Sequence, residues 1–260
     1  MLATPNSPLT RNTRQTLVRT APNPGPMTLD GTNSYAVGDP ASQCVVVVDP
    51  GPLAEGHLHR LSAAGRVELV LLTHRHPDHT AGSKRFHTLT GAPVRALDPA
   101  FCHGGEPLRD GEVITAAGLS LLVIGTPGHS SDSVCFHLPD DGPTGSLLTG
   151  DTILGRGTTI IAYPDGQLRE YLASLHRLRD LGTATVLPGH GPVLPNLVEV
   201  CDTYIDHRQR RLNEVRAALA TLGADATAPA VTDIVYPDLR HQLRRAAEVS
   251  VEAQLDYLRA

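Results

Sequence analysis

The stretch LTHRHPDH, residues 72–79, carries three histidines and an aspartate in the pattern H-x-H-x-D-H: His74, His76, Asp78 and His79. The chain has 13 histidines among 260 residues. At that frequency the pattern arises by chance in roughly a few per thousand chains. Imidazole and carboxylate groups are common ligands of zinc, manganese and iron. Because the stretch directly follows the apolar run VELVL, it predicts a metal-binding loop at the end of a buried strand.

The same arrangement, an apolar strand followed by a polar loop, recurs through the first 195 residues or so. Four further runs, VVVV, LLVIGTPG, SLLTG and TVLPG, are followed by Asp49, His129, Asp151 and His190. Catalytic groups tend to lie on loops that a rigid sheet holds. If the strands are neighbours, these loops converge on one pocket.

The number of candidate ligands exceeds what one tetrahedral ion needs. Five histidines and two aspartates fit two ions that share one carboxylate, with positions left open for water. Asp49 has a simpler interpretation, since Asp before Pro-Gly is also a good turn former. We expect two divalent ions, most readily Zn²⁺, with Mn²⁺ or iron as alternatives.

Composition excludes several classes of partner. The net charge of −5 gives no general attraction for double-stranded DNA or an anionic membrane, and 3% aromatic residues with no Trp provide few stacking platforms. Four widely spaced cysteines indicate free thiols in a reducing compartment. No apolar run reaches the roughly 18 residues of a membrane span. We expect a cytoplasmic protein; an arginine-bearing N-terminus leaves an organelle matrix as an alternative.

The pattern changes near residue 197 from alternating strands to helix. Apolar residues at three-to-four spacing continue to Gly223, and a second stripe runs from Leu239 to Leu255. Residues 226–237 are expected to connect the two. We therefore predict two domains, residues 1–196 and a helical module of residues 197–260.

The ordered motifs VVVVDPG, THRHPDH, TPGHSSDS, TGD and PGHG resemble those of the metallo-β-lactamase superfamily. NPGPMTLDGTNSYAVG, GDTILGRGTTI and YIDHRQRRLNEVRAAL are similar to the beta-lactamase-like protein 2 branch, whose better-studied members cut single-stranded RNA. The resemblance implies an α/β (α+β) fold: a four-layer αββα sandwich with metals at one edge of the sheets. It also implies a small C-terminal, winged-helix-like helical module.

The resemblance also implies a role for each candidate. His74, His76 and His129 would bind the first metal, Asp78, His79 and His190 the second, and Asp151 would bridge them. Asp49 would orient the ligand loop through hydrogen bonds. A metal-bound hydroxide would be the nucleophile, with Asp78 and Asp151 holding its proton.

The sequence is compatible with more than one class of substrate. An endoribonuclease acting on single-stranded RNA is the first hypothesis, supported by Arg208, Arg210, Arg211, Arg244 and Arg245. Against it, residues 199–260 hold 8 Arg but 10 Asp plus Glu. The alternative is a small-molecule ester or thioester hydrolase like glyoxalase II, with weak β-lactamase side activity, although PGHGP differs from the corresponding glyoxalase II loop. A remote alternative is a non-catalytic binding module without metals. The sequence predicts no oligomeric state.

Overall fold

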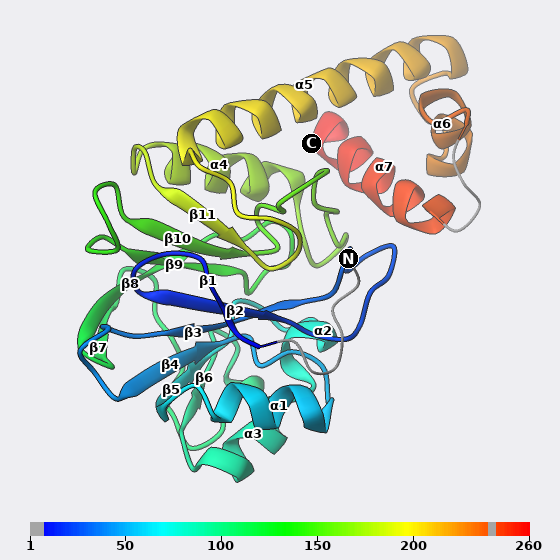
Figure 1. Ribbon diagram of the computed structural model, residues 1–260. Helices are drawn as coiled ribbons and strands as arrows, with labels where there is room; N and C mark the ends of the chain where they lie inside the picture. The colour runs from blue at the N-terminus through cyan, green and yellow to red at the C-terminus, as the bar shows by residue number, and fades with distance from the viewer. Residues whose placement is uncertain (1–7, 239–242) are drawn as a thin grey trace.

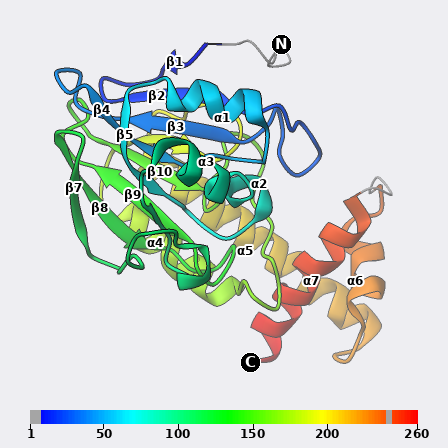
Figure 2. The ribbon, with the colours of Figure 1, turned by 90° about the horizontal axis from the view of Figure 1, so that it is seen from below.

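The computed structural model describes residues 8–238 and 243–260. Two β-sheets pack face to face, and helices cover the outer face of each sheet (Figures 1 and 2). The predicted four-layer αββα sandwich is therefore confirmed. The inner layer between the sheets is an apolar cluster that includes Val46, Leu71, Leu121 and Phe136.

The first sheet has six strands in sequential order, β1 to β6. β3, β4 and β5 lie in its middle, and β4 and β5 run parallel, so both end at the same edge. The strands are Thr10–Arg11 (β1), Thr16–Thr20 (β2), Asn33–Val37 (β3), Cys44–Val48 (β4), Arg66–Leu71 (β5) and Val94–Arg95 (β6).

The second sheet has five strands in the order β11-β10-β9-β8-β7. β10 and β11 are parallel, whereas β9 is antiparallel to both of its neighbours, β8 and β10. β8, β10 and β11 consequently point the same way and end at one edge. The strands are Val113–Ala116 (β7), Leu119–Gly125 (β8), Val134–Leu138 (β9), Ser146–Gly150 (β10) and Thr185–Pro188 (β11).

Two pairs of helices form the outer layers. Leu58, Leu61 and Phe86 of α1 (Glu55–Ser62) and α3 (Ser83–Thr90) pack on the first sheet. On the second sheet, α4 (Leu168–Arg179) and the first half of α5 (Leu197–Leu222) share one apolar cluster. A short α2 (Pro77–Thr80) and a 3-10 turn (Pro99–Phe101) complete this part.

The C-terminal segment is helical, as expected. α5 passes over α4 and continues beyond the sandwich, where α6 (Ala228–Val235) and α7 (Arg244–Arg259) pack against it (Figure 1). The expected connector, residues 226–237, was wrong in one respect because it contains α6. The described residues of this segment, 197–238 and 243–260, hold no strand of a wing. Leu239, the first residue of the second stripe, lies outside the described residues.

No helix in the described parts of the chain is long and apolar enough to cross a membrane.

Candidate metal centre

Five loops meet at one edge of the sandwich because the strands that precede them end there. β4 and β5 bring Asp49 and the residue 72–79 loop from the first sheet. β8, β10 and β11 bring the loops of His129, Asp151 and His190 from the second. The predicted site residues, separated by more than a hundred positions in the chain, are thus brought together.

Three imidazoles form the first group of possible ligands, His74, His76 and His129. His76 Nδ1 lies 3.0 Å from His74 Nε2 and 2.9 Å from His129 Nε2. Neutral imidazole nitrogens at this spacing leave one point that all three lone pairs can reach. The group matches the set that the resemblance implies for the first metal.

Asp78, His79 and His190 form the second group. Asp78 Oδ2 lies 3.3 Å from His79 Nε2 and 3.1 Å from His190 Nε2. The Nε2 atoms of the two imidazoles lie 3.3 Å apart, with the ring planes nearly perpendicular. This group matches the set implied for the second metal.

Asp151 lies between the two groups and turns one oxygen to each. Its Oδ1 is 3.4 Å from the Nε2 atoms of both His79 and His190, and its Oδ2 is 3.8 Å from His129 Nε2. Oδ1 is buried and accepts no hydrogen bond. A buried carboxylate oxygen that accepts no hydrogen bond is costly, and a cation shared by the two groups would satisfy it. The donor set therefore fits two divalent ions bridged by this carboxylate.

The opposite ring nitrogens are held by other groups, which fixes how each imidazole points. His129 Nδ1 lies 2.6 Å from the Ile160 carbonyl oxygen, and His190 Nδ1 lies 3.2 Å from that of Gly31. An Nδ1–H that donates to a carbonyl leaves the Nε2 lone pair free for a metal. His74 is fixed in the same way by Thr73 Oγ1, 3.0 Å from its Nδ1.

Asp49 does more than form a turn. Its carboxylate accepts hydrogen bonds from Thr73 N at 2.8 Å and Thr73 Oγ1 at 2.7 Å, and His79 Nδ1 lies 2.8 Å from it. The residue does occupy a turn conformation, with φ of 50°. It joins the end of β4 to two parts of the ligand loop, as expected of a residue that orients ligands.

The acidic and imidazole groups of the centre shift one another's pKa values. Burial favours the neutral acid, yet His79 and His190 hold the pKa of Asp151 well below its ordinary value. Against the effect of burial, Asp151 keeps the pKa of His79 well above the ordinary value and raises that of His190 to about 9. Burial lowers the pKa of His129 to about 4. Divalent cations would supply the positive charge that those protons otherwise provide, so metal binding would release protons.

Some supporting residues carried no sequence signal. The Ile160 and Gly31 contacts use backbone carbonyls, which any residue type has. Arg75, inside the opening motif, donates to Asp165 and, at 2.8 Å, to Ser131 Oγ, and so ties the ligand loop to two others. Thr73 was detectable in principle because it immediately precedes His74.

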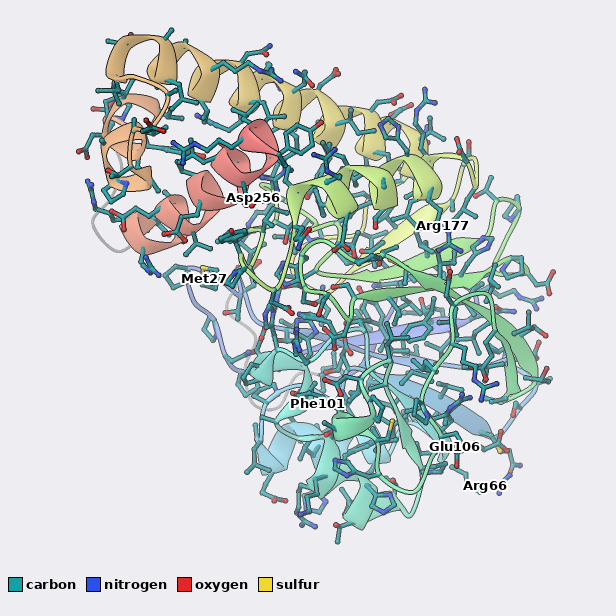
Figure 3. All side chains as sticks on the ribbon, turned by 180° about the vertical axis from the view of Figure 1, so that it is seen from behind. Met27, Arg66, Phe101, Glu106, Arg177 and Asp256 are labelled. Carbon is teal, nitrogen blue, oxygen red and sulfur yellow. The ribbon has the colours of Figure 1, made fainter. Side chains whose placement is uncertain are left out.

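A cavity of about 510 Å³ opens onto the metal groups. His76, Asp78, His129 and Asp151 lie at its base; its other walls are mostly apolar and come from the 27–28 loop, Ile160, Ala162 and α7. Met27 lies close to α7 at the rim (Figure 3). From α7, Arg245, Ala246 and Val249 face the cavity.

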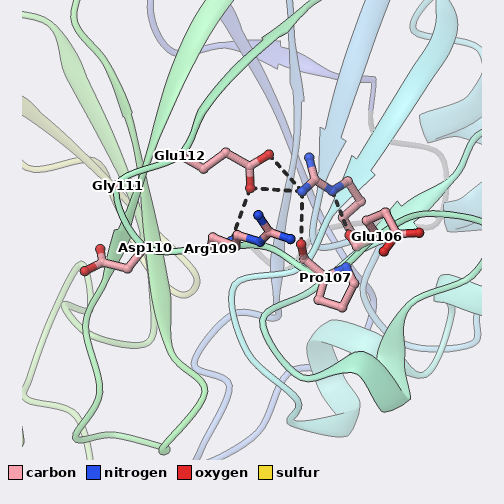
Figure 4. Close-up of a pocket in the computed structure, with 7 residues that line it drawn as sticks. Glu106, Pro107, Arg109, Asp110, Gly111 and Glu112 are labelled. Atoms are coloured by element: carbon pink, nitrogen blue, oxygen red, sulfur yellow. Dashed lines mark hydrogen bonds and ion pairs between the residues drawn. The ribbon is translucent and has the colours of Figure 1, made fainter.

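A larger cavity, about 720 Å³, lies elsewhere, where the 106–112 loop passes between the edge strands β6 and β7 (Figure 4). Arg95 and Glu112 form an ion pair of 2.9 Å in it, and Arg95 also donates to the backbone carbonyls of Glu106 and Pro107. The Arg95 guanidinium is therefore satisfied within the protein. None of the predicted site residues lines it.

Known proteins are similar to this chain in sequence. The chain is 33% identical over 249 residues to the "Beta-lactamase-like protein 2 homolog" of Caenorhabditis elegans, covering 91% of this chain and 81% of that one. It is 34% identical over 207 residues to the "Atrochrysone carboxyl ACP thioesterase" of Aspergillus fumigatus; this match covers 77% of the chain but only 63% of that relative.

Two solved structures are similar to this chain in fold. The metallo-beta-lactamase family protein TTHA1429 from Thermus thermophilus superposes with a TM-score of 0.77 at 26% identity, over 94% of this chain and 93% of that one. TTHA1623, solved in a di-iron-bound form, gives a TM-score of 0.56 at 27% identity, over 70% of this chain and 96% of that one.

The model of one family spans all five loops of the centre. Its description is "Metallo-beta-lactamase superfamily", and it matches residues 27–190. Members of this family are hydrolases, and a relative named above is a thioesterase, so a non-catalytic binding module no longer describes the chain. The chain belongs to the metallo-beta-lactamase superfamily and is a hydrolase of that fold.

Proposed function

We propose that the protein hydrolyses small acyl esters or thioesters at a two-metal centre. The observation that carries the proposal is the cavity above the metal groups, which we call the catalytic cavity. Its walls are mostly apolar, and its base holds His76, Asp78, His129 and Asp151. An acyl chain would bury apolar surface against Ile160, Ala162 and Val249 while its carbonyl reaches the base. The similarity to a protein named as an acyl-carrier thioesterase supports this choice.

Two divalent ions at the centre would lower the pKa of a shared water to near neutral and stabilise negative charge on the substrate oxygens. Asp151 would hold the two groups in register through its two oxygens. Asp78 is the more exposed carboxylate, lines the cavity and receives a 3.3 Å hydrogen bond from Thr32 Oγ1 on Oδ2. It is therefore placed to hold the proton of an attacking water.

We propose zinc as the native metal, because the donor set is rich in imidazole. Manganese and iron remain alternatives, and the related TTHA1623 was solved with two irons. The four cysteines are free, which supports a reducing compartment, and the cytoplasm is the location we propose.

The hypothesis of an endoribonuclease acting on single-stranded RNA is less well supported by the geometry. Its strongest support was five arginines of the C-terminal helices, and four of them are either buried away from the surface or lie beside an acidic side chain. Arg208 is buried and donates to the Thr159 carbonyl, Arg211 donates to Glu214, and Arg244 pairs with Asp233 and Glu248. Arg245 is exposed but lies 4.0 Å from Glu248 and 3.8 Å from Glu252, and Arg210 is exposed; two exposed cations are too few for a groove that follows an RNA backbone.

A panel assay tests the proposal. Purified protein loaded with zinc or manganese would be offered acyl thioesters of increasing chain length, S-lactoylglutathione, a chromogenic cephalosporin and single-stranded RNA. We expect kcat/KM to be greatest for a thioester and to be lost in His76→Ala together with metal. Turnover of RNA above that of every thioester, with the same dependence on His76, would replace the proposal by the nuclease hypothesis.

A further inference from the structure

A small cavity adjoins the one above the metal groups and lies between α5, α7 and the 158–160 loop. Its volume is about 190 Å³. In contrast to the catalytic cavity, it is lined largely by basic and hydroxyl side chains, among them Thr158, Thr159, His207, Arg208, Arg211 and Ser250. We call it the α5–α7 cavity.

Arg208 is the most unusual residue of this cavity, because its side chain is charged and only 4% exposed. It donates from Nη2 to the Thr159 carbonyl oxygen, and its guanidinium lies 5.1 Å from the centre of the Tyr171 ring. Its Nε is buried and has no hydrogen-bond partner. Among the described residues no Asp or Glu forms an ion pair with Arg208. A buried guanidinium without a counter-charge is strongly unfavourable.

Two more residues that line this cavity have a buried nitrogen without a hydrogen-bond partner: Arg211 Nε and His207 Nδ1. Arg211 uses other atoms of its guanidinium for Glu214 and the Val235 carbonyl. Burial, followed by the positive charges of Arg208, Arg211 and Arg210, lowers the pKa of His207. Three side chains that line one cavity, two guanidinium groups and an imidazole, thus each hold a buried nitrogen without a hydrogen-bond acceptor.

We propose that the α5–α7 cavity binds an oxyanion, a carboxylate or phosphate group, between Arg208, Arg211 and His207. Guanidinium groups bind both oxyanions through charge-assisted hydrogen bonds, which are stronger than neutral ones. The hydroxyl groups of Thr158 and Ser250 line the same space and can donate further bonds. The bound anion would provide the counter-charge that Arg208 lacks.

The oxyanion site adjoins the catalytic cavity. Ile160 and Ala246 line both spaces. Thr159 connects them chemically, since its carbonyl accepts from Arg208 while its hydroxyl lies 3.1 Å from Nδ1 of the metal-site residue His129. The oxyanion can therefore have two sources. One is the anionic end of a substrate whose acyl group reaches the metals, an assignment that rests on the proposed function. The other is a free anion.

Inorganic phosphate is the probe that tests the site. It would be titrated into the zinc-loaded full chain at constant ionic strength while the imidazole resonances of His207 are followed by NMR. We expect a saturable shift of these resonances. Arg211→Gln should weaken phosphate binding by about tenfold, as loss of a charge-assisted contact implies. Arg210→Gln removes the same charge one residue away, outside the cavity, and should change the affinity by less than about twofold.

Several results would overturn the site. They are the absence of a saturable His207 shift, equal weakening by the two glutamine variants, or phosphate that shifts only the metal-ligand histidines. Arg208→Lys offers a second variant; in a folded protein it should weaken binding, because Lys lacks the fork of donors. The NMR signal does not depend on turnover. If the protein shows the His207 shift but hydrolyses no thioester, the oxyanion site is confirmed and the proposed thioesterase function is wrong.

Inhibition kinetics distinguish the two sources of the anion. Phosphate that competes with an anionic thioester but not with a neutral ester assigns the site to the substrate's anionic end. In that case Arg211→Gln should raise KM for the anionic thioester by about the same tenfold and leave the neutral ester unaffected. Saturable binding with no competition overturns the substrate assignment and leaves a free anion as the ligand.

Discussion

Gly189 packs directly against the carboxylate of Asp151, the proposed bridge between the two metals. A Cβ atom there would be 2.6 Å from Asp151 Oδ1 and 2.8 Å from His79 Cε1. We expect Gly189→Ala to displace Asp151, lowering the metal content of the purified protein from about two ions per chain to about one and lowering turnover by at least about tenfold. Elemental analysis and kinetics check this.

Gly56→Ala is the matched control for that substitution. Gly56 lies in α1, and a Cβ there meets nothing within 4 Å. Alanine should raise the free energy of unfolding by about 0.5 to 1 kcal/mol because it favours the helix, with no effect on metal content. Unchanged metal content and turnover in Gly189→Ala would contradict the bridging role of Asp151.

His57 gives the protein a specific sensitivity to acid. It is 2% exposed, lies 2.9 Å from Ser34 Oγ, and burial together with the charge of Arg19 lowers its pKa to about 4. The unfolded chain, with a pKa near 6.5, binds this proton first as pH falls. The free energy of unfolding should therefore decrease between about pH 6.5 and 4, by about 2 to 3 kcal/mol at pH 4.5.

Urea unfolding at pH 7 and pH 4.5 measures this effect. His57→Gln removes the titrating group and should reduce the loss of stability between the two pH values by that amount. A variant that loses as much stability as the wild type would show that the acid sensitivity arises elsewhere, for example at the metal-site carboxylates.

At the same scale, the sequence predicted the candidate ligands and the orienting role of Asp49, but not the backbone groups that orient the other imidazoles. His74, His76, Asp78 and His79 were visible because imidazole and carboxylate at that spacing are uncommon. The carbonyls of Ile160 and Gly31 hold His129 and His190, yet a carbonyl belongs to every residue. Arg208 was interpreted as a possible RNA contact, and its burial depends on how α5 packs, which local sequence does not determine.

At the scale of elements, α7 forms one wall of the catalytic cavity and should limit the length of the acyl chain that fits. Val249 faces the catalytic cavity from α7, so Val249→Phe should fill part of it. We expect KM to rise by about tenfold for a long-chain acyl thioester and by less than about twofold for an acetyl thioester. Metal content should stay unchanged.

Val113→Phe is the matched control, because Val113 is 61% exposed on β7, away from the cavity. It should leave KM for both substrates as in the wild type. If Val249→Phe raises KM equally for short and long chains, the acyl group does not extend toward α7 and the cavity serves another part of the substrate.

The elements that the sequence predicted share one property, a continuous apolar run or a long helical stripe. β4, β5, β8, β10 and β11 are runs of this kind, and each contributes side chains to the apolar cluster between the sheets. α6 was missed because its eight residues lie among Pro, Thr and Asp, which favour turns. Its Val231 is buried against α5 and α7, a tertiary contact that outweighs the local preference.

At the scale of the whole molecule, the predicted division at residue 196 cuts through packed structure. Leu197, Cys201, Tyr204 and Leu212 of α5 are buried in the same cluster as α4 and the second sheet. The Tyr204 hydroxyl also bonds both N and O of Leu154, at 3.0 Å each, just beyond Asp151. The first half of α5 is therefore part of the sandwich, whereas its second half packs with α6 and α7.

Two shortened chains separate these roles. Burial of each large apolar side chain contributes about 1.5 to 3 kcal/mol, so losing α5 removes an amount similar to the whole stability of a typical domain, about 5 to 15 kcal/mol. A chain ending at residue 196 should show no cooperative thermal unfolding and bind no metal stoichiometrically. A chain ending at Gly223 keeps α5 and should unfold cooperatively, at a lower temperature than the full chain, and bind two ions. Because it lacks α7, it should no longer discriminate between short and long acyl chains. Calorimetry and elemental analysis measure both. Cooperative unfolding of the 1–196 chain with two bound ions would instead show that residues 197–260 form a separable domain.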